Sequence, residues 1–203
     1  MPFVPTVMAN LMRAKAVPSK ILGSKSTPLL SAVSSAVCSY VPAAAVVVST
    51  NMVTGPGSGT MTGKIVGCVP SAMSSMMVMK ATSLGLRGRD MARLFDAISF
   101  GVCQVLQTLS VAQGTVIGGG PGAGTGKITN LVPSVLERLI VASLAGRVLM
   151  GSKTSPVFTA VAFGICTHIM TAGTVVTTCV GAFAPPPAGP VPIPCAPGPG
   201  RLY

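Results

Sequence analysis

Few side chains in this sequence can carry catalytic chemistry. The carboxylates are Asp90, Asp96 and Glu137, and the one imidazole is that of His168. General acid–base catalysis needs a positioned carboxylate or imidazole, usually with a second group that orients it. No Cys-x-x-Cys pair and no Cys/His spacing typical of a zinc site occurs. The sequence therefore predicts a protein that is not an enzyme and that holds neither a metal nor a cofactor.

A glycine-rich segment, Gly120–Lys127, invites comparison with a phosphate-binding P-loop. That motif needs a glycine five residues before the glycine of its Gly-Lys pair, and a hydroxyl residue after the lysine. Here Pro121 and Ile128 stand at those positions, and in a similar earlier segment they are Ser58 and Ile65. Because both segments fail at both positions, we interpret them as glycine-rich loops, each joining two strands.

The two glycine segments belong to a wider internal similarity with a period of about 64 residues. A helix-like segment, Phe95–Cys103, matches Phe158–Cys166, and Leu30–Cys38 is a weaker copy. Two further pairs of matching segments are Gly23–Pro28 with Gly151–Pro156, and Gly55–Ile65 with Gly120–Ile128. The sequence therefore predicts three tandem units.

Each unit has the same predicted order of elements, which makes the fold class α+β. An apolar helix comes first, at 29–41, 94–110 and 156–171, because one face carries its apolar residues. A β-branched strand follows, at 46–50, 114–117 and 174–178. After the glycine-rich loop we expect a second short strand, at 64–68 and 127–131. Pro70 and Pro133 then begin a second helix that runs to about 85 or 150.

The predicted organisation has five parts. The third unit has no second helix, and its proline-rich end is expected to be extended and to reach a neighbouring subunit. The parts are an N-terminal arm or helix at 1–22, repeat 1 at 23–86, repeat 2 at 87–150, a truncated repeat 3 at 151–184, and a C-terminal arm at 185–203.

Cys38, Cys103 and Cys166 occupy one equivalent position and are predicted to be small core residues. Cys179 and Cys195 flank the proline loop and would pair in an oxidising compartment. His168 aligns with Tyr40 and Val105, so no imidazole recurs among the units; we expect its hydrogen bonds to be satisfied within the fold or by solvent.

The composition predicts a surface that is largely covered. Charged residues make up 8% of the chain and hydrophobic residues 49%, with a net charge of +11. An ordinary soluble domain has about 25% charged residues. The covering is either other protein subunits or lipid. The uncharged stretches are broken by proline, glutamine and threonine before they reach bilayer length, which favours protein. The positive charge would suit an acidic protein surface, anionic lipid or nucleic acid, or serve solubility alone.

The Val/Gly/Ala texture, the basic charge, the proline-rich arm and the Gly120–Ile128 turn resemble virion structural proteins of tailed bacteriophages, in tails and baseplates. The resemblance implies a non-enzymatic virion subunit in the tail, baseplate or neck, made in the host cytoplasm, with copies of itself and other structural proteins as partners. The alternatives are a small multi-helix integral membrane subunit and a basic internal or packaging protein that contacts nucleic acid. Candidate assembly contacts are Gly55, Pro56, Gly57, Lys64, Gly120, Pro121, Gly122, Lys127, Pro185, Pro186, Pro187 and Pro190.

Overall fold

The computed structural model describes residues 3–19, 25–53, 57–118, 122–145, 154–179, 191–193 and 201–202, and within them the chain is α+β. The helices are α1 (Pro5–Ala16), α2 (Ser26–Ala44), α3 (Pro70–Ser83), α4 (Met91–Thr108), α5 (Pro133–Ala145) and α6 (Thr154–Ala172), with a 3-10 turn at Val17–Ser19. The strands are β1 (Val46–Val53), β2 (Gly57–Val66), β3 (Val111–Gly118), β4 (Gly122–Thr129), β5 (Thr174–Cys179), β6 (Val191–Ile193) and β7 (Arg201–Leu202).

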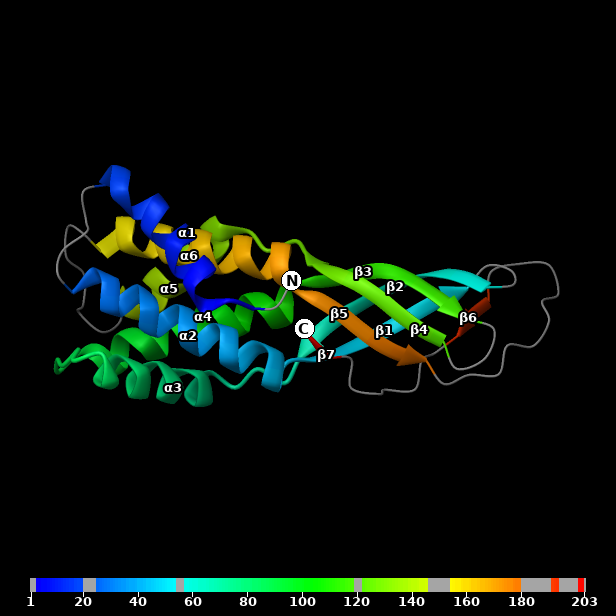
Figure 1. Ribbon diagram of the computed structural model, residues 1–203, viewed down its shortest axis with the longest axis horizontal. Coiled ribbons are helices and arrows are strands. Elements are labelled where there is room, and N and C mark those ends of the chain that lie inside the picture. Colours follow the sequence, from blue (N-terminus) through cyan, green and yellow to red (C-terminus); the bar gives the residue numbers. More distant parts are fainter. Residues whose placement is uncertain are drawn as a thin grey trace.

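The helices gather at one end of an elongated molecule and the strands at the other (Figure 1). The strands form one antiparallel sheet in the order β6-β1-β2-β3-β4-β5-β7. Strands β1, β3 and β5 lead away from the helices, and β2 and β4 return to them. Because β1 also contacts β5 and β7, the sheet curls until its two sides meet.

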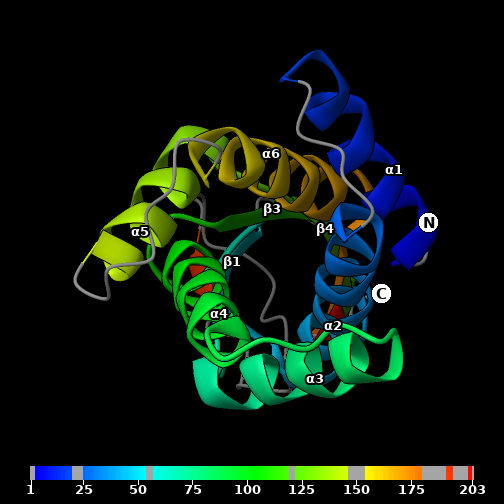
Figure 2. The ribbon, with the colours of Figure 1, turned by 90° about the vertical axis from the view of Figure 1, so that its left-hand side faces the viewer.

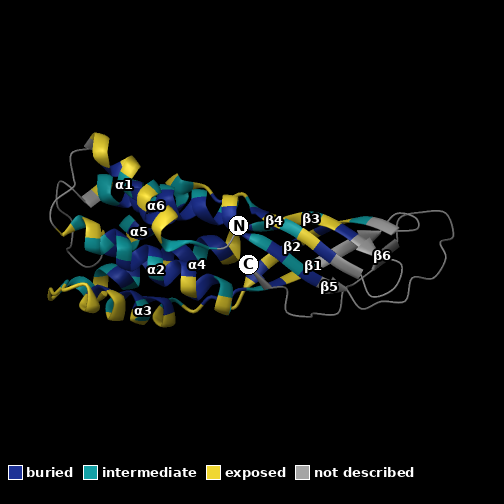
Figure 3. Cartoon of the chain, viewed as in Figure 1, coloured by how far each residue is buried: buried dark blue, intermediate teal, exposed yellow. Residues whose placement is uncertain are grey.

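Viewed along the long axis, the helices form a ring (Figure 2). Each helix packs against the next in sequence, and α1 closes the ring by packing against α6. Helices α2, α4 and α6 lie nearer the axis, with α1, α3 and α5 outside and between them. Buried residues line the inward helix faces and alternate with exposed ones along the strands (Figure 3).

The interior of the curled sheet is narrow, and its glycines make it so. Met61 of β2 is 1% exposed and points inward, where an added Cβ at Gly124 would lie 3.2 Å from its sulfur. An added Cβ at Gly126 would lie 2.5 Å from the Met61 Cε atom. Gly63 is confined by its neighbouring strand instead, because its Cβ would meet the Val48 carbonyl oxygen of β1 at 2.9 Å. Gly124 and Gly126 thus leave the space that the Met61 side chain fills.

The predicted glycine-rich loops are therefore wrong in their extent. Gly57 begins β2 and Gly122 begins β4, so most glycines of both segments lie within strands. Their spacing of two residues places them on one face of a strand, which is the inward face here. The predicted second strands at 64–68 and 127–131 begin too late for the same reason.

The other predicted elements are confirmed, with somewhat different ends. The helices expected at 29–41, 94–110 and 156–171 are α2, α4 and α6, and the β-branched runs are β1, β3 and β5. Pro70 and Pro133 begin α3 and α5. Of the predicted C-terminal arm, the described parts are β6 and β7, which pair with this chain's own β1 and β5.

Replacing Gly124 by alanine tests the close packing inside the sheet. The new Cβ would lie 2.6 Å from the Thr177 Oγ1 atom as well as against Met61. Such overpacking typically costs about 1–3 kcal/mol, and we expect that loss in the free energy of unfolding measured with urea. The matched control is Gly88→Ala, where an added Cβ meets nothing within 4 Å. Equal stability of the two variants would contradict a filled interior.

Candidate functional site

The described assembly-contact candidates lie on the sheet. Lys64 and Lys127 are exposed on its outer face, within β2 and β4 rather than at the strand starts expected. Gly57 and Gly122 are the first residues of these strands. The remaining candidates lie outside the described residues: Gly55, Pro56, Gly120, Pro121, Pro185, Pro186, Pro187 and Pro190.

Exposed threonines share the outer face of the sheet with Lys64, Lys127, Gln113 and two valines, Val48 and Val66, which are 49% and 40% exposed. Thr60, Thr115 and Thr125 are exposed and stand opposite one another on β2, β3 and β4. Lys127 stands opposite Gln113 in the neighbouring row. The carboxylates of the whole chain are at positions 90, 96 and 137, all in the helical part. The outer face of the sheet is therefore a hydroxyl-rich surface whose charge is positive.

Two side chains hold the starts of outer helices by the same kind of hydrogen bond. The backbone N–H of Val69, which precedes Pro70, donates to the hydroxyl of Tyr40 at 2.8 Å. The backbone N–H of Val4, which precedes Pro5, donates to Nε2 of His168 at 3.2 Å. His168 is 3% exposed and also packs edge-on against the ring of Phe3. Tyr40 and His168 align in the sequence, so a recurring role is present although the residue type differs.

Burial lowers the pKa of His168, since the charged imidazolium is disfavoured away from water. The neutral ring suits its role, because an unprotonated Nε2 is needed to accept the hydrogen bond from Val4. The prediction that His168 has a hydrogen-bond partner within the fold or in solvent is confirmed. Its hydrogen bond with Val4 joins the N-terminal segment to α6.

The predicted core cysteines are confirmed: Cys38, Cys103 and Cys166 are 6%, 1% and 1% exposed. Burial raises the pKa of Cys38 and Cys166 to about 12. Cys103 differs in having a thiol neighbour, Cys68, to which its side chain is hydrogen-bonded; this bond lowers the pKa of Cys68 and raises that of Cys103. Cys195 lies outside the described residues, so the pairing with Cys179 stays a prediction.

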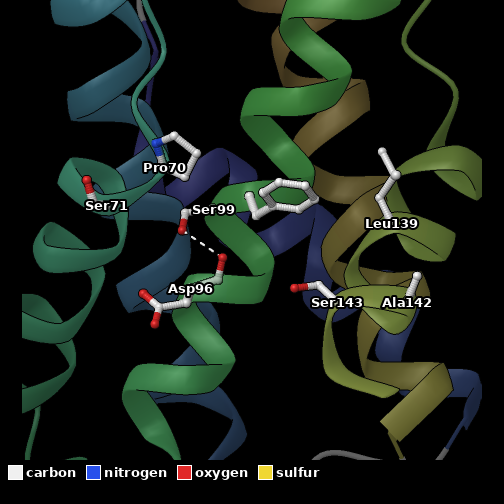
Figure 4. A pocket seen from close by; sticks show the side chains of 8 residues that line it. Pro70, Ser71, Asp96, Ser99, Leu139, Ala142 and Ser143 are labelled. Carbon is white, nitrogen blue, oxygen red and sulfur yellow. Dashed lines mark hydrogen bonds between the residues drawn. The ribbon is translucent and has the colours of Figure 1, made fainter. Parts of the chain in front are cut away.

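A groove of roughly 640 Å³ opens between α3, α4 and α5 (Figure 4). Its lining residues are Pro70, Ser71, Asp96, Ser99, Phe100, Leu139, Ala142 and Ser143. Asp96 accepts a hydrogen bond from Ser74 at 2.5 Å, and it is the one carboxylate in this lining. Phe100 is 44% exposed. The other lining residues are apolar or carry a hydroxyl group.

Within the described ranges, no three His, Cys, Asp or Glu side chains come together in a way that could hold a metal ion. The one described helical stretch with the length and hydropathy of a membrane span is Ser155–Ala172 of α6, with mean hydropathy 1.4, and 56% of it is buried inside the fold. No protein-family model, curated protein or solved structure matches the chain.

Helix α1 carries a pattern that the sequence comparison missed. Its buried Met8, Met12 and Ala16 lie three, seven and eleven residues after Pro5. The buried residues of α3 and α5 include those with the same offsets from Pro70 and Pro133: Met73, Met77, Ala81, Leu136, Ile140 and Leu144. The dipeptide Val-Pro precedes all three sets, at 4–5, 69–70 and 132–133, but it also occurs at 17–18, 41–42 and 191–192, so the signal is the dipeptide together with the apolar spacing.

Lowering the pH tests the His168 contact. The folded-state pKa lies below the unfolded value of about 6.5, so the folded chain binds fewer protons than the unfolded chain. The contribution to stability is therefore fully present above pH 6.5 and is lost as pH falls through the folded pKa. We expect the free energy of unfolding to fall between about pH 7 and pH 5. His168→Gln, which keeps an acceptor but does not titrate, should remove this slope; an unchanged slope would contradict the assignment.

Proposed function

We propose that this chain is a non-enzymatic structural subunit of a large assembly, in the tail, baseplate or neck of a tailed bacteriophage virion, and that it occupies a symmetry axis there. The observation that carries the proposal is the arrangement of similar helix pairs and strand pairs around one long axis within a single chain (Figure 2). Symmetric assemblies offer equivalent contacts around their axes. A single chain with internal threefold similarity is able to meet three of them at once.

The proposal includes three copies of one helix–strand–strand–helix unit. Two copies are residues 26–83 and 91–145, which have this order of elements. Ile65 stands opposite Val47, the second residue of β1, and Ile128 stands opposite Ala112, the second residue of β3. Two residues further on, Gly67 and Asn130 both have positive φ, at 89° and 64°. Shared register and shared turn geometry support a common design.

The third copy is, in this proposal, divided between the two ends of the chain. It starts with α6 and β5, and β7 supplies the inner part of its second strand, where Leu202 stands opposite Val175, the second residue of β5. Helix α1 supplies its second helix, with the same proline offsets as α3 and α5. Figure 1 shows both chain ends at the junction between helices and sheet, where β2 and β4 pass into α3 and α5.

A circular permutant tests the divided unit. Tyr203 is joined to Met1 by a short glycine-serine linker, and new ends are opened between Gly85 and Gly88, in an exposed connection. Because permutation is tolerated at exposed connections when the original ends lie close together, we expect the same circular dichroism spectrum and one cooperative melting transition. The control opens the chain inside α4, after Val102, and should not fold. A permutant that fails to fold, like the control, would contradict the division.

The membrane alternative rests on the apolar stretch of α6, and more than half of that stretch is covered by the fold itself. The nucleic-acid alternative rests on exposed basic residues of the helical end: Lys80, Arg87, Arg89 and Arg93. Neither alternative accounts for the similarity of the helix pairs and strand pairs, on which the axial proposal is based.

The copy number of the chain in purified particles tests the axial position. Quantitative mass spectrometry should give one copy for each threefold or sixfold ring of the neighbouring structural protein, because one chain fills the axis. A copy number equal to that of the ring subunits would contradict the proposal. Flotation with lipid, or release from particles by nuclease, would instead favour the membrane or the nucleic-acid alternative.

A further inference from the structure

We propose that an acidic protein ring encircles the outer face of the sheet. The ring contacts three equivalent basic positions of the sheet: Lys64, Lys127 and Arg201. This inference rests on the proposed axial position and adds the chemistry of the partner. We refer to the three positions as the basic collar.

The collar follows from the strand register. Lys64 stands opposite Val48, the third residue of β1, and Lys127 stands opposite Gln113, the third residue of β3. Arg201 stands opposite Val176, the third residue of β5. Each basic residue follows a glycine and precedes Ile or Leu. The three positions therefore lie at one level of the sheet, close to the helices.

The curl of the sheet spreads these positions in different directions. Strands β2, β4 and β7 are separated from one another by β3 and β5, and β7 lies beside β1 on the other side. Two strand spacings are about 10 Å, and over that distance the closed sheet turns through about a third of its circumference. A flat membrane or the side of a nucleic-acid duplex reaches one such position at a time. A partner that surrounds the sheet reaches all three.

Charge complementarity identifies the partner as acidic. The salt bridge between Asp90 and Arg93, at 3.4 Å, lies in the helical end, and the sheet strands contain no Asp or Glu. The positive charge of Lys64 and Lys127 is therefore not balanced by an acidic neighbour on the sheet. Lys64 stands opposite the exposed Val48, and the exposed threonines of the same face donate and accept hydrogen bonds without adding charge. Single exposed ion pairs contribute little to affinity, so simultaneous contact at all three positions is what makes the collar effective.

The test uses the purified chain and a defined probe. The probe is a three-arm scaffold that carries one hexaglutamate peptide on each arm, and the comparison is a linear peptide with the same number of glutamates. Binding is measured by fluorescence anisotropy at low salt. Because linked contacts raise avidity, we expect the three-arm probe to bind at least about tenfold more tightly than the linear peptide.

Charge-neutralising variants locate the contact. Lys64→Gln, Lys127→Gln and Arg201→Gln should each remove most of the three-arm advantage, with unchanged circular dichroism showing that the fold is intact. The matched control is Lys80→Gln, which removes one exposed lysine of α3 with the same change of charge. The inference is overturned if Lys80→Gln has the same effect, or if the linear peptide binds equally well. It is likewise overturned if duplex DNA or phosphatidylglycerol vesicles bind more tightly through Lys64 and Lys127. Because copy number in the particle is measured independently, a failed probe with one copy per ring overturns the acidic ring alone.

Discussion

The narrow interior of the curled sheet is the constraint on which the remaining architecture depends. Strands can surround so small a space only if some inward positions are glycine. A side chain from the facing part of the sheet then fills the space beside them. Gly124 and Gly126 leave this space for Met61, and Thr177 donates a hydrogen bond to its sulfur at 3.1 Å. The tight curl makes the strands enter and leave the sheet on all sides of the long axis. The helices attached to them are thereby distributed into a ring.

The ring in turn depends on close contact between its outer and inner helices. An added Cβ at Gly101 of α4 would lie 2.9 Å from Ile140 of α5, and one at Gly164 of α6 would clash with Met12 of α1. These glycines are the second residue before Cys103 and Cys166, and the buried Ala36 stands at the same place before Cys38. The absence of bulky side chains at this place lets the methionine and isoleucine side chains of the outer helices approach the inner backbone. Apolar burial along these contacts stabilises a fold with few ion pairs.

Sequence reasoning predicted the elements whose signals are local and regular. The apolar faces of α2, α4 and α6 and the β-branched runs of β1, β3 and β5 follow known periodicities. The glycine segments failed because glycine normally marks a turn, whereas here the space inside the sheet overrides its low strand propensity. The similarity of α1 to α3 and α5 was missed because it consists only of a Val-Pro dipeptide and of apolar residues at the same distances after the proline. The common role of Tyr40 and His168 was hidden because a hydroxyl and an imidazole accept the same hydrogen bond.

The three proposed units agree at some buried positions, such as Cys38, Cys103 and Cys166, and differ at others. Inside, the aligned positions 40, 105 and 168 are tyrosine, valine and histidine, because each has only to suit the neighbours that it meets locally. At the level of the collar the residues are lysine, lysine and arginine, all of one charge. Packing alone does not require this agreement, because the side chains of Lys64 and Lys127 are exposed to solvent and are not part of the core. A partner that meets all three positions in the same way does require it, since one reversed charge would break the equivalence of the contacts. Agreement in charge at these exposed positions therefore favours a surface that a symmetric partner recognises.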